Sequence, residues 1–155
     1  MPITKILVPI DFSEGSTSAL DEAIEVATKF GATIDLLHAW QLPLYGGADM
    51  VGGVNIAFAD DIERLAGAEL SRWRDSLRAR GFAGARAFLT MSDPATAILE
   101  RSTDGYDLIV TGTHGRTGIS RWALGSVAEK VVRHALCPVL TVRAPATPAV
   151  EAPAR

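Results

Sequence analysis

Cysteine is almost absent from this sequence, since Cys137 is the only one among 155 residues. A single cysteine excludes an intrachain disulfide, and it also excludes zinc sites built from four cysteines. Long apolar runs are missing too, and none approaches the roughly 20 residues that a membrane-spanning helix needs. The first residues lack the apolar stretch and cleavage site of a signal peptide. We therefore expect a cytoplasmic protein that does not associate with membranes.

Positive charge is not in excess either, because 15 lysine and arginine residues stand against 18 aspartate and glutamate residues, for a net charge of −3. Proteins that bind nucleic acid usually carry a clustered basic excess, so this balance argues against nucleic acid as a partner. The apolar share of 48% and the charged share of 21% are ordinary for a globular protein. The length suits one domain whose core needs no crosslinks.

Short apolar segments alternate with amphipathic segments along the chain. Apolar runs rich in β-branched residues predict strands at residues 3–9, 32–39, 85–91, 106–112 and 138–143. Helical spacing predicts apolar stripes, one made of Leu20, Ala23, Ile24, Ala27 and Phe30 and one of Ile62, Leu65, Ala66, Leu70, Trp73 and Leu77. Strands that alternate with helices predict an α/β fold, here a single doubly wound domain with a five-stranded, mostly parallel sheet and helices on both faces.

Glycine, proline and aspartate mark where the predicted helices begin and end. Gly31 and Gly81 are expected to end the first two helices. Asp93 followed by Pro94 predicts the start of a third helix, and a fourth is expected from 126 to 135. The remaining two segments are irregular: a glycine-rich loop at 41–55 and a disordered, Ala/Pro-rich tail at 144–155. The predicted organisation is one domain, residues 1–143, followed by that tail.

The segment TGTHGRTGISRWALGS, residues 111–126, joins the fourth predicted strand to the last predicted helix. Ligands of open parallel sheets bind outside the carboxyl ends of the strands. Clustered glycines let backbone N–H groups approach an anion, and a helix that starts at Ser126 offers further N–H groups and a positive dipole end. A Walker A loop is excluded because no Gly-Lys-[Ser/Thr] occurs, and PIDFS stands where a dinucleotide fingerprint would follow the first strand. Taken alone, the segment predicts either a phosphate site or a tight connection.

The spacing G-x2-G-x9-G-[S/T], formed by Gly112, Gly115, Gly125 and Ser126, resembles the ATP-binding branch of the universal stress protein family. The opening ILVPIDFS, the central DLIV and THGRTG, and the closing GSVAEKV and CPVL resemble the same family, and together they cover nearly all of residues 2–143. The resemblance implies a Rossmann-like, adenine nucleotide alpha hydrolase-like fold that binds ATP. It also implies a homodimer paired through the last strand, residues 138–143.

The adenosine end of the implied site would be formed by Asp11, Pro9 and Ala39. The family often has valine at position 39 and glycine at position 92, where this sequence has Ala39 and Ser92. Contact at position 39 is expected to be hydrophobic or through the backbone, which alanine weakens without abolishing. An alternative role for Asp11 is to cap the first helix. The two roles can coexist, because a carboxylate accepts hydrogen bonds from ribose hydroxyls or from backbone N–H groups.

The ribose and phosphate end would be formed by residues that share glycine-rich or helix-starting positions, namely Gly112, His114, Gly115, Gly125, Ser126 and Val127. A purely structural explanation of Ser126 and Glu129 is that they form a capping box, S-x-x-E, at the start of the last helix. We expect this capping box in the empty protein. His114 is expected to donate a hydrogen bond rather than to act as a general base. His38 and His134 are expected to be packing or surface residues, and Cys137 a buried, inert thiol.

The resemblance leaves three functions open. The first is an ATP-binding universal stress protein that acts as a nucleotide-dependent sensor or regulator in stress response. The second is a slow ATPase or a nucleotide-dependent transferase, but phosphoryl transfer needs a positioned nucleophile and usually a metal ion held by acidic side chains. No such acid or base is evident near the expected phosphates, so no catalytic residue or protein-held metal is predicted, although Mg²⁺ or Mn²⁺ can accompany ATP. The third is a nucleotide-free interaction protein, which the intact glycine spacing disfavours.

Overall fold

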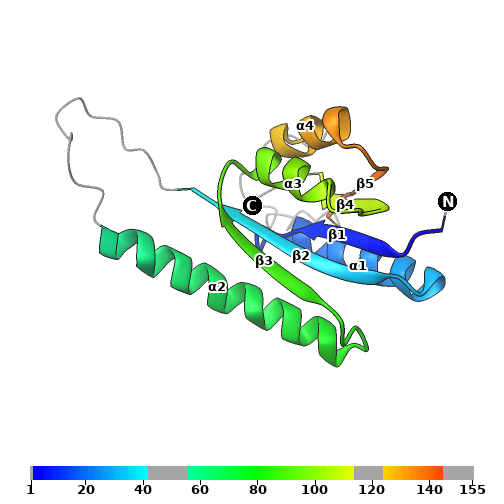
Figure 1. Ribbon diagram of the computed structural model, residues 1–155, viewed down its shortest axis with the longest axis horizontal. Helices are drawn as coiled ribbons and strands as arrows, with labels where there is room; N and C mark the ends of the chain where they lie inside the picture. Colours follow the sequence, from blue (N-terminus) through cyan, green and yellow to red (C-terminus); the bar gives the residue numbers. More distant parts are fainter. Residues whose placement is uncertain (1, 42–55, 114–123, 145–155) are drawn as a thin grey trace, which may run out of the picture.

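The computed structural model describes residues 2–41, 56–113 and 124–144. The elements follow one another as β1 (Lys5–Pro9), α1 (Glu14–Phe30), β2 (Thr33–Trp40), α2 (Ile56–Ala79), β3 (Arg86–Met91), α3 (Pro94–Ser102), β4 (Leu108–Gly112), α4 (Ser126–His134) and β5 (Val139–Val142). The strands form one sheet in the order β3-β2-β1-β4-β5, and every pairing in it is parallel (Figure 1). The predicted α/β fold is therefore confirmed, while most of the predicted loop at 41–55 and of the tail lies outside the described residues.

Helices cover both faces of the sheet, with α3 and α4 on one face and α1 and α2 on the other (Figure 1). Successive strand residues point to opposite faces, so each strand contributes side chains to two separate hydrophobic cores. In β1, Ile6 and Val8 enter the core under α1 and α2, whereas Leu7 enters the core under α3 and α4. Three consecutive buried apolar residues in one short strand are what a sheet covered on both faces requires.

Two predicted helix boundaries are confirmed in atomic detail. Gly31 ends α1 in the left-handed conformation (φ 68°), and Asp93 caps α3 by accepting a hydrogen bond from the backbone N–H of Thr96 at 3.1 Å. Two predicted core positions are wrong, because Phe30 and Leu65 are exposed. Both lie beyond the buried stretch of their helices: Ala27 is the last buried residue of α1, and Leu70 is the first described residue of α2 that is buried.

None of the helices within these described stretches is long and apolar enough to cross a membrane. The cytoplasmic location expected from the sequence stays a prediction.

A buried carboxylate, Asp35, lies near the start of β2 with a side chain that is 2% exposed. Arg86, its register partner on β3, donates to it three times: from Nη2 to Oδ2 at 2.6 Å, from Nε to Oδ1 at 3.1 Å and from the backbone N–H to Oδ1 at 3.3 Å. The hydroxyl of Tyr106 donates to Oδ2 at 2.8 Å. Burial alone would raise the pKa of Asp35, but the hydrogen bonds from Arg86 and Tyr106 outweigh it and hold the pKa below its ordinary value. This cluster ties β2 and β3 to the segment that leads into β4.

Asp35 is expected to make the stability of the fold depend on pH in the acid range. Its pKa is lower in the folded chain than in the unfolded one, so its stabilising contribution is complete above the unfolded pKa of about 4 and is lost as the pH falls through the folded pKa. The free-energy difference between the wild type and Asp35→Asn should therefore be largest at neutral pH and shrink below about pH 4. Urea denaturation at a series of pH values measures this, and a difference that stayed constant into acid would contradict it.

Candidate functional site

A cavity of about 350 Å³ lies at the carboxyl ends of the strands, where β1 and β4 are neighbours and the strand order reverses. Its volume falls in the range of small-molecule sites, roughly 300 to 1,000 Å³. The lining residues come from all three layers of the fold: Pro9, Ile10, Asp11, Ser16, Leu37, His38, Ala39, Pro94, Ile98, Thr111, Gly112, Thr113, Gly125, Ser126, Val127 and Ala128.

Seven of the nine residues predicted to contact nucleotide line this one cavity, namely Pro9, Asp11, Ala39, Gly112, Gly125, Ser126 and Val127. The other two, His114 and Gly115, lie outside the described residues. Parallel strands end at the same edge of the sheet, so residues far apart in the sequence meet there. Their contact with nucleotide stays a prediction.

The turn after β1 holds Asp11 in a network of serine hydroxyls. Oδ1 of Asp11 accepts hydrogen bonds from the backbone N–H of Ser13 at 3.1 Å and from the hydroxyls of Ser13 and Ser16. The N-cap of α1 is Ser13, whose Oγ accepts from the N–H of Ser16 at 3.3 Å. Asp11 is therefore not the cap itself: it orients the residue that caps. Its carboxylate lies close to the N-terminus of α1, where the helix dipole favours negative charge.

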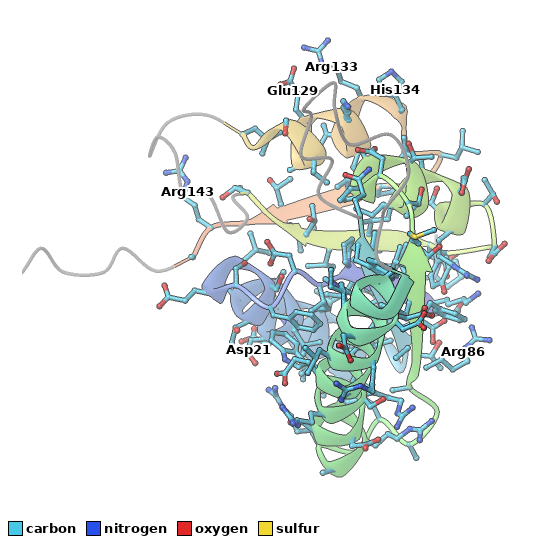
Figure 2. All side chains as sticks on the ribbon, turned by 90° about the vertical axis from the view of Figure 1, so that its left-hand side faces the viewer. Asp21, Arg86, Glu129, Arg133, His134 and Arg143 are labelled. Carbon is cyan, nitrogen blue, oxygen red and sulfur yellow. The ribbon has the colours of Figure 1, made fainter. Side chains whose placement is uncertain are left out.

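The start of α4 differs from the predicted capping box. Gly125 is the N-cap, no described side chain caps the helix, and Glu129 forms an ion pair with Arg133 at 2.9 Å instead (Figure 2). The box requires serine at the N-cap and glutamate three residues later. Here the helix begins one residue earlier than that pattern needs, so Ser126 occupies the first helical position. Its N–H and those of the next two residues have no carbonyl partner inside the helix, and they lie at the cavity.

A short hydrogen-bonded path connects α4 to the sheet. The backbone N–H of Gly125 donates to the carbonyl of Thr113 at 2.7 Å, and the N–H of Thr113 donates to the carbonyl of Val142 in β5 at 2.9 Å. The two ends of the glycine-rich segment are thus joined directly to each other. This contact places the first turn of α4 beside the end of β4, which is the geometry that anion binding at a strand-to-helix junction needs.

Gly112 has a packing role that the sequence pattern did not indicate. A Cβ at this position would lie 3.0 Å from the backbone carbon and oxygen of Gly15, at the start of α1. Side chains do not normally approach backbone atoms so closely. Glycine therefore allows the close approach of β4 to α1, in addition to any contact with a ligand.

Sequence reasoning did not place His38 at the site, because it is expected there only to pack or to lie on the surface; it is one of nine lining residues outside the predicted set. It is 7% exposed and forms part of the cavity wall. Its Nδ1 lies 2.6 Å from the carbonyl oxygen of Ile10, and its ring lies against that of Phe12 with centroids 4.4 Å apart. Its position one residue before Ala39, at a strand end, is the sequence signal that points to it. His134 is exposed on α4, as predicted. Cys137 matches its prediction in part, because it is half-buried, and burial raises the pKa of its thiol.

The cavity has two chemically different parts. Leu37, Ala39, Ile98 and Val127 give it apolar walls, while hydroxyls and backbone N–H groups gather between β4 and the start of α4. Within the part of the chain that the structure describes, no group of three or more His, Cys, Asp or Glu residues could hold a metal ion. The arrangement suits a ligand with a flat apolar group at one end and an anionic group at the other.

Comparisons with known proteins show the family and the fold. The profile of the universal stress protein family matches residues 2–143. Universal stress protein YxiE of Bacillus subtilis is 32% identical over 146 residues, covering 90% of this chain and 98% of that one. The universal stress protein UspA structure from Lactobacillus plantarum superposes with a TM-score of 0.69 at 27% identity, covering 92% of this chain and 99% of that one. A family protein of Arabidopsis thaliana, solved with AMP bound, has a TM-score of 0.63 at 23% identity, covering 92% and 93% respectively, and shows likeness of fold. This chain therefore belongs to the universal stress protein family.

Proposed function

We propose that this chain binds ATP in the cavity between β1, β4 and α4 and acts as a nucleotide-dependent sensor or regulator in stress response. The observation that carries the proposal is the placement of the glycine spacing. Gly112, Gly125 and Ser126 lie together at the cavity, with the first turn of α4, which no described side chain caps, among them. Backbone N–H groups at such a junction favour phosphate.

The two parts of the cavity fit the two ends of a nucleotide. The apolar walls around Ala39 and Ile98 suit an adenine ring, and Asp11 lies where its carboxylate can accept bonds from ribose hydroxyls. The hydroxyls of Thr113 and Ser126 add donors for phosphate. The Arabidopsis relative shows that the fold accommodates an adenine nucleotide in one of its members. The preference for ATP here rests on this chain's own glycine spacing.

Hydrolysis is the weaker alternative. Among the described lining residues, the side chains able to act as a base are Asp11 and His38. Oδ1 of Asp11 is engaged by Ser13 and Ser16, and Nδ1 of His38 is engaged by the Ile10 carbonyl. We therefore propose that the protein holds ATP, with Mg²⁺ or Mn²⁺ bound to the phosphates rather than to a protein cluster, and that any hydrolysis is slow.

A homodimer through β5 is part of the proposal. In the described sheet β5 is an edge strand, and its residues Val139, Leu140 and Val142 are only half-buried. Nearby, Val132 and Leu136 expose large apolar side chains. An apolar edge strand is usually paired or covered, because its open N–H and carbonyl groups otherwise invite aggregation.

ATP is expected to raise the melting temperature of the protein, because a ligand that binds only the folded state stabilises it. At a concentration of about 100 times the dissociation constant, the gain is about 2.7 kcal/mol, or several degrees for a domain of this size. Thermal-shift measurements and calorimetric titration test this, with GTP as a control for the base. If folded protein gave no heat of binding and no shift in melting temperature at millimolar ATP, the proposal would be refuted. Mass spectrometry of molecules that co-purify with the protein would show whether bound nucleotide remains intact.

A further inference from the structure

The ring of His38 is attached to the turn that follows β1. Its Nδ1 lies 2.6 Å from the carbonyl oxygen of Ile10, and a carbonyl oxygen can only accept a hydrogen bond. Nδ1 must therefore carry a hydrogen, which determines the ring's tautomer when it is neutral. The backbone N–H of Ile10 also donates to the carbonyl of Leu37 at 2.8 Å. Ile10 is thus held to β2 twice, once through the backbone and once through the imidazole.

The same ring supports the residue on the other side of Asp11. Phe12 has a φ of 64°, and it is the one non-glycine residue with a positive φ among those the structure describes. Bulky residues rarely adopt this conformation, so the surrounding structure must hold it. The Phe12 ring packs against His38 with centroids 4.4 Å apart and meets Trp73 edge-on at 5.9 Å. His38 therefore contacts the residues immediately before and after Asp11.

We propose that His38 is a positioning residue for the nucleotide site: by holding Ile10 and Phe12 it places the carboxylate of Asp11 at the cavity. The serine bonds of Asp11 attach it to the start of α1. The attachment to β2 runs through Ile10 and His38, and His38 is directly followed by Ala39. The imidazole thus sets the distance between Asp11 and Ala39, the two sides of the proposed adenosine pocket. This inference rests on the proposed function for its binding readout.

Two substitutions separate the hydrogen bond from the bulk of the ring. An asparagine side chain carries an N–H that can lie close to the position of the imidazole Nδ1, so His38→Asn can still donate to Ile10, whereas His38→Leu fills the space without a donor. We expect His38→Leu to weaken ATP affinity about tenfold, in line with the loss of one buried hydrogen bond. His38→Asn should restore a large part of that loss. The affinities are measured by calorimetric titration well below the melting temperature of each variant.

His134 provides a matched control. Its Nδ1 also lies against a backbone carbonyl, that of Lys130 at 2.8 Å, but it is exposed on α4 and points away from the sheet (Figure 2). His134→Leu should leave ATP affinity unchanged within about twofold. If His38→Leu bound ATP as tightly as the wild type, or if His38→Asn were as weak as His38→Leu, the positioning role would be refuted.

Two further readouts do not depend on ATP. Long-range ¹H–¹⁵N NMR of the imidazole should show hydrogen on Nδ1 of His38, and a ring with hydrogen on Nε2 alone would overturn the proposal. Amide hydrogen exchange at Ile10 should accelerate in His38→Leu and stay slow in His38→Asn. A wild type that binds no ATP would refute the proposed function, and NMR and exchange would then decide whether His38 holds the turn. If His38→Leu failed to fold, the ATP affinity of His38→Asn and the tautomer of His38 in the wild type would test the positioning role instead.

Discussion

Replacing Ala39 with phenylalanine is expected to weaken ATP binding by at least about a hundredfold while leaving the fold intact. Ala39 is half-buried near the end of β2 and lines the cavity. A phenyl ring there would occupy the apolar end of a cavity of about 350 Å³, where the adenine is proposed to lie. Filling existing space adds apolar contacts, so the melting temperature should not fall by more than a few degrees.

Ala68→Phe is the matched control for this substitution. Ala68 is exposed on α2 and does not line the cavity, so the same change in side chain should leave ATP affinity as it is. Calorimetric titration of the three proteins measures the effect. Wild-type affinity in a folded Ala39→Phe variant would show that ATP binds elsewhere or leaves the apolar part of the cavity empty.

Replacing Asp35 with alanine is expected to destabilise the fold by about 3 kcal/mol, at the lower end of what removing one partner of a buried pair costs. The hydroxyl of Tyr106, a residue that is 5% exposed, would lose its acceptor. The Arg86 guanidinium would lose its partner too, but its side chain is 55% exposed and can be solvated again, which limits the loss (Figure 2). The melting temperature should fall by about 10 °C.

Asp61→Ala serves as the control, because the ion pair of Asp61 with Arg64 at 3.1 Å lies between two largely exposed side chains on α2. Such surface pairs contribute at most about 1 kcal/mol. Equal losses of stability in the two variants, measured by urea denaturation, would contradict the role given to Asp35. ATP affinity should be unchanged in Asp35→Ala, because Asp35 lies near the start of β2 and the cavity lies at its end. Ala39→Phe is thus expected to lose ATP affinity and keep its stability, whereas Asp35→Ala is expected to lose stability and keep its ATP affinity.

The architecture could be predicted because its signals are local. A sheet covered on both faces needs strands that are apolar on both sides, and residues 6–8 already show this. Gly31 and the pair Asp93–Pro94 mark helix ends through their own backbone preferences. The prediction of the capping box failed for the opposite reason. Ser126 and Glu129 satisfy the local pattern, but the N–H of Gly125 donates to the carbonyl of Thr113 and the helix starts from that glycine. A contact between distant parts of the chain overrode a local preference.

From the sequence alone one can infer the alternation of strands and helices, the family resemblance and the positions of the candidate contacts, because each depends on residues close together along the chain. The tertiary structure decided which of the candidate contact residues lie together in the fold. It placed Pro9, Ala39, Gly112 and Ser126 around one cavity, since parallel strands end at a common edge. It also revealed the Asp35 cluster, the packing of Gly112 on Gly15 and the hold of His38 on the Asp11 turn. These contacts join residues 28 to 97 positions apart, and such pairings leave no periodic trace in a single sequence.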